Sequence, residues 1–188
     1  MNAMAEEPEK HISEPTRHHK YFKNLKIDAI PNARFDFGDD NAKLVPIIFS
    51  HGLNASGATY SKHCIELASH GYIVFAIWHK CGSCQYTEDI NGSIPFDTKH
   101  RFYDYDVRKT QLNKRVEEIS LLIDEIFGEH FLHDTFGFPS GVELDKEKLA
   151  VSGHSFGAMT SIAVAREDKR VKVCMPMDPW FFPVMYDL

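Results

Sequence analysis

Hydrophobic residues from Leu44 onward fall into short runs that are separated by stretches with helical spacing. Short apolar runs bounded by turn residues predict buried strands, here over Leu44–Ser50, Tyr72–Trp78, Leu149–Ser152 and Val171–Met177. Apolar residues spaced by three and four predict helices, here over Thr59–His70, Val107–Phe127 and Phe156–Ala165. This alternation indicates a parallel sheet with right-handed helical crossovers, whose chemistry lies at the carboxyl ends of the strands.

Other segments carry weaker patterns. The stretch Lys26–Phe37 is expected to hold one or two short edge strands, although Pro31 interrupts the pattern. Residues 128–146 form an aromatic, glycine-bearing excursion after the long helix, and the second face of that helix is expected to be charged. Residues 1–22 are polar and proline-bearing, which predicts a flexible arm, so residues 23–188 are expected to make one domain.

Composition agrees with a single α/β domain: the chain has 188 residues, of which 43% are hydrophobic and 26% charged. At this size a chain buries roughly 70% of its unfolded surface, so a core forms without disulfides or a metal. The cysteines are therefore expected to be reduced thiols, at Cys64, Cys81, Cys84 and Cys174. A net charge of -6 disfavours a nucleic-acid partner. Neither a secretory signal, a myristoylation glycine nor an apolar run of ~20 residues is visible, so we expect a cytoplasmic protein.

The strongest chemical motif is Gly153-His154-Ser155-Phe156-Gly157, which fits the G-x-S-x-G nucleophile elbow. It lies between a predicted strand and a predicted helix, as that motif requires. The sharp turn presents the serine hydroxyl above the sheet, and the first turn of the helix directs free N–H groups toward developing negative charge. We therefore interpret Ser155 as a catalytic nucleophile; the alternative is a structural turn bounded by glycines.

Two further elements complete the expected site. An oxyanion needs two N–H donors, one after the nucleophile and one from the loop after an earlier strand, which would be the amides of Phe156 and Leu53. The acid is expected at the end of the next strand, where Asp178 follows an apolar run and would orient a histidine. The alternatives are a plain strand-to-helix turn at Leu53 and an Asp-Pro turn at Asp178.

The histidine of the triad is not visible where this motif order requires it. Triads of this kind run serine, acid, histidine, but no histidine follows His154. The upstream candidates are expected to have roles in loops or helix ends, at His51, His70, His79 and His100. Loss of one triad member typically costs about 10⁴ to 10⁶ in turnover. The chain as given is therefore expected to be nearly inactive.

Two other segments invite a functional interpretation. Trp180 and Phe181 begin an apolar segment beside Asp178, where they would line the substrate pocket or else pack a core. Cys81-Gly82-Ser83-Cys84 has the spacing of a redox or metal motif, but no second ligand pair accompanies it. A simple loop is the favoured interpretation, and neither metal nor cofactor is expected.

Several segments together resemble one family, the platelet-activating factor acetylhydrolases, or group VII phospholipases A2. The segments are VPIIFSHGL, LASHGYIVFAIWH, RKTQLNKRVEEISLLID, LAVSGHSFGA and MDPWFFP, in that order over about Leu44 to Pro183. The resemblance implies an α/β-hydrolase fold lacking its C-terminal strands, so the chain is expected to be a fragment or a truncated gene model. It further implies Ser155 as nucleophile, Asp178 as acid, Leu53 and Phe156 as oxyanion donors, and a histidine from beyond Leu188.

The family resemblance also implies a substrate, since its members release short or oxidised sn-2 acyl groups from phospholipids. We therefore expect an esterase that works through an acyl-enzyme, with a phospholipid or other ester as substrate and transient contact with a membrane surface. Two alternatives stay open. One is a general carboxylesterase of the dienelactone or polyester hydrolase type, and the other is a non-catalytic pseudoenzyme that binds lipid.

Overall fold

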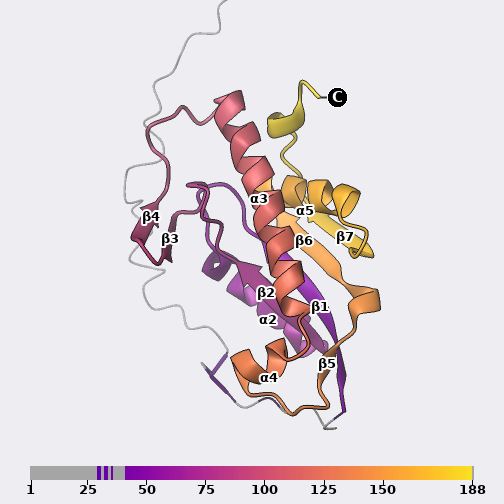
Figure 1. The fold of residues 1–188 in the computed structure, drawn as a ribbon. Coiled ribbons are helices and arrows are strands. Elements are labelled where there is room, and N and C mark those ends of the chain that lie inside the picture. The colour runs from indigo at the N-terminus through magenta and orange to yellow at the C-terminus, as the bar shows by residue number, and fades with distance from the viewer. Residues whose placement is uncertain (1–28, 31, 34, 36–40, 188) are drawn as a thin grey trace, which may run out of the picture.

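A parallel sheet forms the centre of the protein. The structure is a computed structural model that describes residues 29–30, 32–33, 35 and 41–187. The main strands are β1 (Lys43–Ser50), β2 (Tyr72–Ile77), β6 (Ala150–His154) and β7 (Val173–Met177). They lie in the order β2-β1-β6-β7 and all pair in parallel, while the short β5 (Glu143–Leu144) pairs with the beginning of β1 (Figure 1). The predicted parallel sheet is thus confirmed, with each strand close to its expected range.

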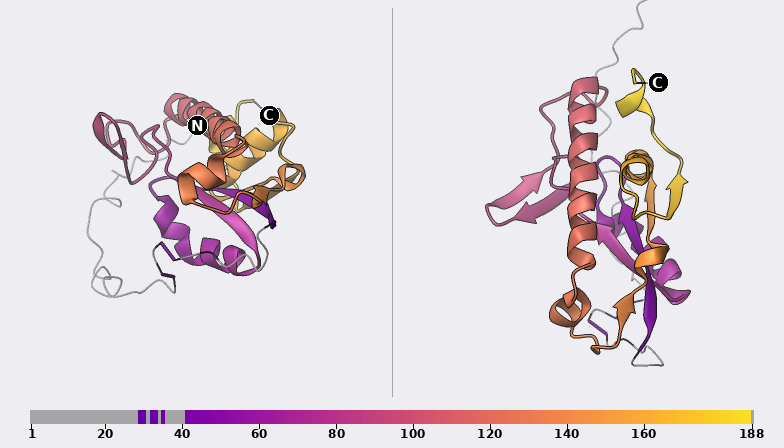
Figure 2. Two further views of the ribbon diagram at one scale, coloured as in Figure 1. Left: turned by 60° about the horizontal axis from the view of Figure 1, so that its bottom comes forward. Right: turned by 45° about the vertical axis from the view of Figure 1, so that its right-hand side comes forward.

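Helices cover both faces of this sheet. The long α3 (Tyr105–Ile126) and α5 (Phe156–Glu167) pack together on one face, and α2 (Ser61–Ser69) lies on the other (Figure 2). The 3₁₀ turn η1 (Gly57–Tyr60) leads into α2. Gly71 follows this helix with φ +89°, the left-handed conformation expected at a helix end. The three predicted helices are therefore present.

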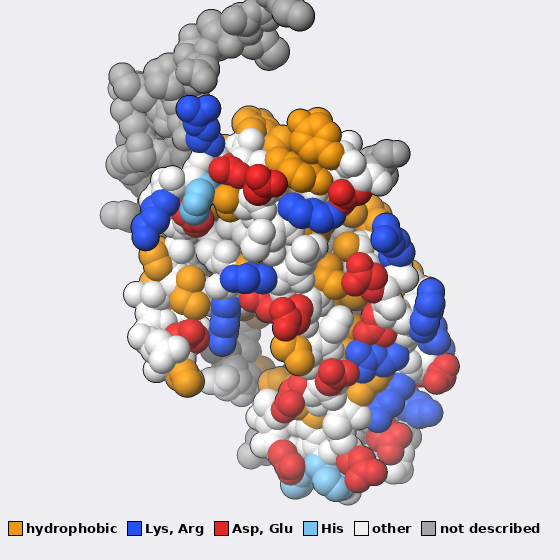
Figure 3. Space-filling model, turned by 45° about the horizontal axis from the view of Figure 1, so that its top comes forward, with side chains coloured by type: hydrophobic (Ala, Val, Ile, Leu, Met, Phe, Trp, Pro, Cys, Tyr) orange, Lys and Arg blue, Asp and Glu red, His pale blue; other side chains and the backbone are white. Residues whose placement is uncertain are grey.

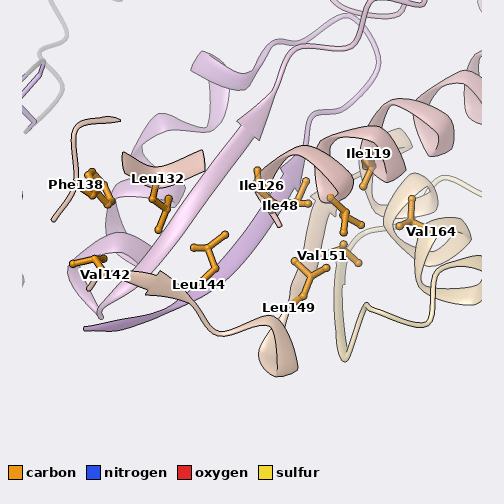
Figure 4. Packing of buried hydrophobic residues seen from close by; sticks show 11 residues of the cluster. Ile48, Ile119, Ile126, Leu132, Phe138, Val142, Leu144, Leu149, Val151 and Val164 are labelled. Carbon is orange, nitrogen blue, oxygen red and sulfur yellow. The ribbon is translucent and has the colours of Figure 1, made fainter. Parts of the chain in front are cut away.

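The hydrophobic core lies between α3 and the sheet. Ile119, Ile123 and Ile126 of α3 are almost completely buried and pack against Ile48 and Val151 of the strands (Figure 4). These isoleucines recur at three and four, so one stripe of the helix faces the sheet. Burying such a side chain contributes about 1.5–3 kcal/mol, and this contact fixes the carboxyl-terminal part of the long helix against the sheet.

The excursion at residues 128–146 is more ordered than its sequence indicates. It contains α4 (Phe131–Phe136), β5 and the start of the 3₁₀ turn η2 (Lys146–Lys148). A hairpin that we did not predict comprises β3 (Tyr86–Asp89) and β4 (Gly92–Pro95). Its two-residue turn is Ile90-Asn91, and Gly92 begins β4 with φ 117°. A last 3₁₀ turn, η3 (Phe182–Val184), lies near the carboxyl end of the described residues.

Two predicted segments lie wholly or mostly outside the residues that the structure describes. The flexible arm expected at residues 1–22 lies outside the described residues. Most of the predicted edge-strand segment, residues 26–37, also lies outside them, and residues 29, 30, 32, 33 and 35 are not in strands. The edge strands therefore stay a prediction.

The exposed side of α3 is polar and charged, as expected, but three polar residues of this helix do not belong to it. Three polar residues of this helix, Arg108, Gln111 and Arg115, are buried together with Leu112, and both arginines are 0% exposed. Positions 108, 111, 112, 115 and 119 lie on one side of a helix because they are three or four apart. The buried stripe of α3 is therefore apolar near its carboxyl end and polar near its amino end, where the helix crosses the candidate site.

Candidate active site

Ser155 lies at a strained turn between β6 and α5. Its backbone has φ 55° and ψ −114°, a region that a residue with a side chain rarely adopts. Hydrogen bonds hold this peptide in place: the Ser155 N–H donates to the Met177 carbonyl at 3.0 Å, and the Ser155 carbonyl accepts the N–H of Met159 and Trp180, each at 3.1 Å. The conformation is the sharp strand-to-helix turn that the motif predicts.

The glycines on either side of the turn allow α5 to approach the sheet. A Cβ atom on Gly157 would lie 2.0 Å from the Ser50 carbonyl oxygen, and one on Gly153 would lie 2.5 Å from the Gly157 backbone. Distances below 3.0 Å are not tolerated by real Cβ atoms, and here the neighbouring atoms are backbone. The motif's glycines are therefore needed for helix–strand contact, and they bring the end of β1 against the start of α5.

The loop after β1 lies directly beside the turn. A Cβ on Gly52 would be 3.5 Å from the His154 carbonyl oxygen. The Tyr60 hydroxyl accepts the Gly52 N–H at 3.3 Å and shares a 2.8 Å hydrogen bond with His154 Nδ1. Leu53 packs against the apolar cluster that contains Phe156. The structure thus brings both predicted oxyanion residues to one place, and Tyr60 joins their two segments.

Asp178 follows β7 immediately and is next to Ser155 in the sheet. His154 and Met177 are direct partners in the pairing of β6 with β7, so the next residue along each strand is Ser155 and Asp178. Asp178 has φ 47°, which turns the chain at the strand end, and its side chain is exposed. The two predicted catalytic residues therefore emerge from neighbouring strand ends.

The predicted pocket residues lie on the same side. The Trp180 ring meets the Phe156 ring edge-on, with centroids 5.5 Å apart, and stacks on Phe182 at 5.3 Å. Phe181 is 47% exposed. Other aromatic rings extend this cluster toward the start of α3, namely Phe102, Tyr103, Tyr105 and Tyr186. Tyr103 and Tyr186 are 70% and 73% exposed. Figure 3 shows a patch of hydrophobic side chains at the upper edge of the molecule, with acidic and basic side chains around it.

The upstream histidines have other partners. His51 is completely buried, with Nδ1–H donating to the Gly52 carbonyl at 2.7 Å and Nε2 accepting the His79 N–H at 3.3 Å. Burial, followed by the nearby positive charge of Arg115, lowers the pKa of His51 to about 2. Among the described residues no histidine is hydrogen-bonded to Ser155. The outer histidines pair with carboxylates, His70 with Glu66 and His100 with Asp97.

His79 belongs to a polar network beneath the site that the sequence did not reveal. Its Nε2 lies 2.8 Å from Ser50 Oγ, and its Nδ1 lies 2.5 Å from Glu118 Oε2 on α3. His79 is fully buried, which lowers its pKa, and burial raises the pKa of Glu118. The neutral ring therefore donates from Nδ1 to the carboxylate and accepts the hydroxyl proton of Ser50, and ties β1 and β2 to α3.

The cysteines lie apart from Ser155 in loops, a helix and a strand. All four are free, and Cys81 Sγ lies 2.8 Å from Ser83 Oγ. No group of three metal-ligating side chains occurs in the portion that the structure describes. The loop at residues 81–84 contacts the loop after β1, since the Asn54 N–H donates to the Ser83 carbonyl at 2.9 Å.

Among the described residues, none of the helices combines the length and the apolar composition of a membrane span.

The sequence is similar to a known protein family over most of its length. The family model of platelet-activating factor acetylhydrolase, isoform II, matches residues 10–188. The chain belongs to this family. Platelet-activating factor acetylhydrolase from Cavia porcellus is 36% identical over 185 residues, covering 89% of this chain and 41% of the relative. The Bos taurus protein of the same name is 33% identical, covering 87% of this chain and 40% of the relative.

The platelet-activating factor acetylhydrolase relatives are longer, and this chain spans about two fifths of their length. A solved structure, the ferulic acid esterase from Streptomyces cinnamoneus, matches 73% of this chain and 39% of its own, with a TM-score of 0.55 and 20% sequence identity. At that identity the likeness concerns the fold. The family and this neighbour confirm the α/β-hydrolase fold.

Proposed function

We propose that the protein is a serine esterase that hydrolyses short or oxidised sn-2 acyl esters of phospholipids through an acyl-enzyme. Family membership supports the reaction class. The observation that carries the proposal is the strained backbone of Ser155, φ 55° at a strand-to-helix turn, beside the loop that follows β1. In that position the serine hydroxyl is presented to a substrate, and the start of α5 directs its positive dipole end to the same point.

The proposed mechanism follows from this placement. Ser155 Oγ attacks the ester carbonyl as its proton passes to a general base, and the oxyanion of the tetrahedral intermediate accepts hydrogen bonds from the amides of Leu53 and Phe156. The intermediate collapses as the base returns this proton to the departing lysophospholipid alcohol, and water, activated by the same base, then releases the acid from the acyl-serine. Asp178 would fix the tautomer of the histidine that acts as general base. Because the described histidines do not bond to Ser155, we propose that this base comes from beyond Leu188, as in the family pattern.

The surroundings support the choice of substrate and its location. Trp180 and Phe181 offer apolar surface beside Asp178, which suits a short acyl chain better than a polar group. The exposed aromatic rings Tyr103 and Tyr186 suit transient contact with a membrane surface, because aromatic side chains favour the interface between lipid and water. Free thiols at every cysteine support a reducing, cytoplasmic setting.

The test is covalent labelling of the natural full-length protein with a fluorophosphonate, followed by peptide mapping. We expect the label on Ser155, no label in Ser155→Ala, and normal labelling in the control Ser69→Ala, whose hydroxyl caps a carbonyl in α2. Phospholipids with acetyl or long sn-2 chains, assayed beside simple aryl esters, separate a phospholipase from a general carboxylesterase. Lipid binding without labelling of Ser155 would refute the esterase and indicate a pseudoenzyme.

A further inference from the structure

Arg115 is a fully buried arginine directly behind the candidate oxyanion site. Its Nη1 donates to the His51 carbonyl at 2.7 Å, and its Nε donates to Ser83 Oγ at 2.8 Å. Its guanidinium carbon lies 4.2 Å from the centroid of the Phe156 ring. One side chain of α3 therefore contacts the loop after β1, the loop after β2 and the first residue of α5.

The hydrogen bonds and the ring contact of this buried charge are with neutral groups, while Glu118 on the same helix contributes a favourable Coulomb interaction. Burial lowers the pKa of Arg115, yet arginine remains protonated in proteins. An isolated charge is costly to bury unless hydrogen bonds and other favourable contacts compensate. A hydrophobic residue of similar volume would fill this position at lower cost. Filling space is therefore a poor reason for an arginine here, and its contacts indicate what it does.

Each contact reaches a segment that carries a proposed oxyanion donor. The His51 carbonyl belongs to the loop that ends in the Leu53 amide, two residues later. The Ser83 hydroxyl accepts the Arg115 Nε–H, and the Ser83 carbonyl accepts the Asn54 N–H. Arg115 therefore also holds the loop after β1 indirectly, through the loop after β2. The Phe156 ring belongs to the residue that supplies the second donor. The guanidinium group is rigid and planar, and its donors hold fixed directions.

We propose that Arg115 is a positioning residue that holds the Leu53 and Phe156 amides at the separation needed to bind an oxyanion, with its positive charge behind them. This inference rests on the proposed function, because it concerns the same site. Oxyanion donors must lie 2.7–3.1 Å from the developing charge to stabilise it, so a small displacement of either segment weakens both hydrogen bonds. The substrate itself does not contact Arg115.

The chain offers a matched control in Arg108. It is also 0% exposed and lies seven residues earlier on α3, but it donates to the Phe102 carbonyl at 2.9 Å and to Gln111 Oε1 at 2.7 Å. Neither contact reaches the loop after β1. Arg115→Gln and Arg108→Gln therefore remove equivalent buried charges from one helix, and we expect both to lower stability. They should differ in their effect on the reaction.

The experiment uses the natural full-length protein, with rates expressed per active site titrated by the fluorophosphonate. For an acetyl ester, Arg115→Gln should lower kcat about tenfold to a hundredfold with little change in KM, because removing one oxyanion donor outright costs about 10²–10³. The corresponding thionoester should lose much less, since sulfur is a poor hydrogen-bond acceptor. The ratio of ester to thionoester rates should therefore fall. Arg115→Lys keeps the charge and should recover part of the loss.

The outcomes separate the two proposals. The proposed role of Arg115 would be overturned if Arg115→Gln kept the wild-type ratio of ester to thionoester rates. It would also be overturned if Arg108→Gln lowered this ratio as much as Arg115→Gln does. If Arg115→Gln does not fold, Arg115→Lys decides in its place, because it loses the planar fork and should show a reduced ratio per titrated site. Absence of Ser155 labelling in the unsubstituted protein would instead refute the esterase function itself.

Discussion

The buried histidine His51 makes the stability of the protein depend on pH. In the folded state this imidazole is neutral, since burial and the Arg115 charge lower its pKa to about 2. In the unfolded chain a histidine has a pKa of about 6.5. As the pH falls below that value, only the unfolded state takes up a proton at this position. The contribution of His51 to folding stability is therefore fully present above about pH 7, and it is lost steadily as the pH falls toward 2.

The size of this effect follows from the two pKa values. Between pH 7.5 and pH 5.5 the unfolded histidine gains about 0.8 of a proton and the folded one almost none, which amounts to about 1.4 kcal/mol of lost stability. His51→Asn removes the titrating group, so its free energy of unfolding should decline less over this range, by about that amount. The exposed His130 provides the control, and His130→Asn should follow the wild-type pH dependence.

The assay is urea unfolding of the wild-type, His51→Asn and His130→Asn proteins at several pH values, analysed with a linear dependence on denaturant. Other titrating groups, Glu118 among them, are present in all three proteins and largely cancel in the comparison. Parallel curves for wild type and His51→Asn would refute the reasoning. An NMR titration of wild-type His51 supplies an independent check, because a midpoint near pH 6 would show that the ring is not held neutral.

Two further predictions concern packing. Gly157→Ala should destabilise the protein by at least about 2 kcal/mol, because its Cβ would lie 2.0 Å from the Ser50 carbonyl oxygen. In the control Gly128→Ala the nearest atom is 3.1 Å away, so calorimetry should show a change below about 1 kcal/mol, and equal losses would refute the clash. Ile119→Ala should cost about 2–5 kcal/mol in urea unfolding, since Ile119 is fully buried. Leu121→Ala, 60% exposed on the same helix, should stay within about 0.5 kcal/mol, and similar values for the two would contradict the assigned core.

The parts that the sequence predicts are those in which local pattern and tertiary structure agree. The central strands β1 and β6 are largely buried, so their apolar runs, such as Leu44–Ser50, are clear signals. The turn at Ser155 is predictable for a different reason: its glycines are dictated by contact between backbones, and few other residues satisfy that geometry. The β3–β4 hairpin carries less information, because it is short and two-stranded, and its turn residues Ile90-Asn91 are not a preferred two-residue hairpin pair.

The polar layer under the site was not predictable from hydrophobic periodicity, because that analysis assigns every charged residue to solvent. Arg108, Gln111 and Arg115 are nevertheless in phase with Leu112 and Ile119, which face the protein interior. Polar residues that continue an apolar stripe toward the carboxyl ends of parallel strands are a signal that sequence analysis can use. Such residues cost stability where they are buried, so their partners should be sought among the loops that carry the chemistry.

This placement explains why the candidate site depends on residues far from the nucleophile motif. The turn at Ser155 is fixed by its own glycines and by β7, whereas the loop after β1 is held by other elements. The Asn54 N–H donates to the Ser83 carbonyl in the loop after β2. Side chains add to this, the Tyr60 hydroxyl bonded to the Gly52 N–H and Arg115 bonded to the His51 carbonyl. The two halves of an oxyanion site therefore differ in origin. One half is encoded within five consecutive residues, whereas the other requires α3 to be packed before its amide has a defined position.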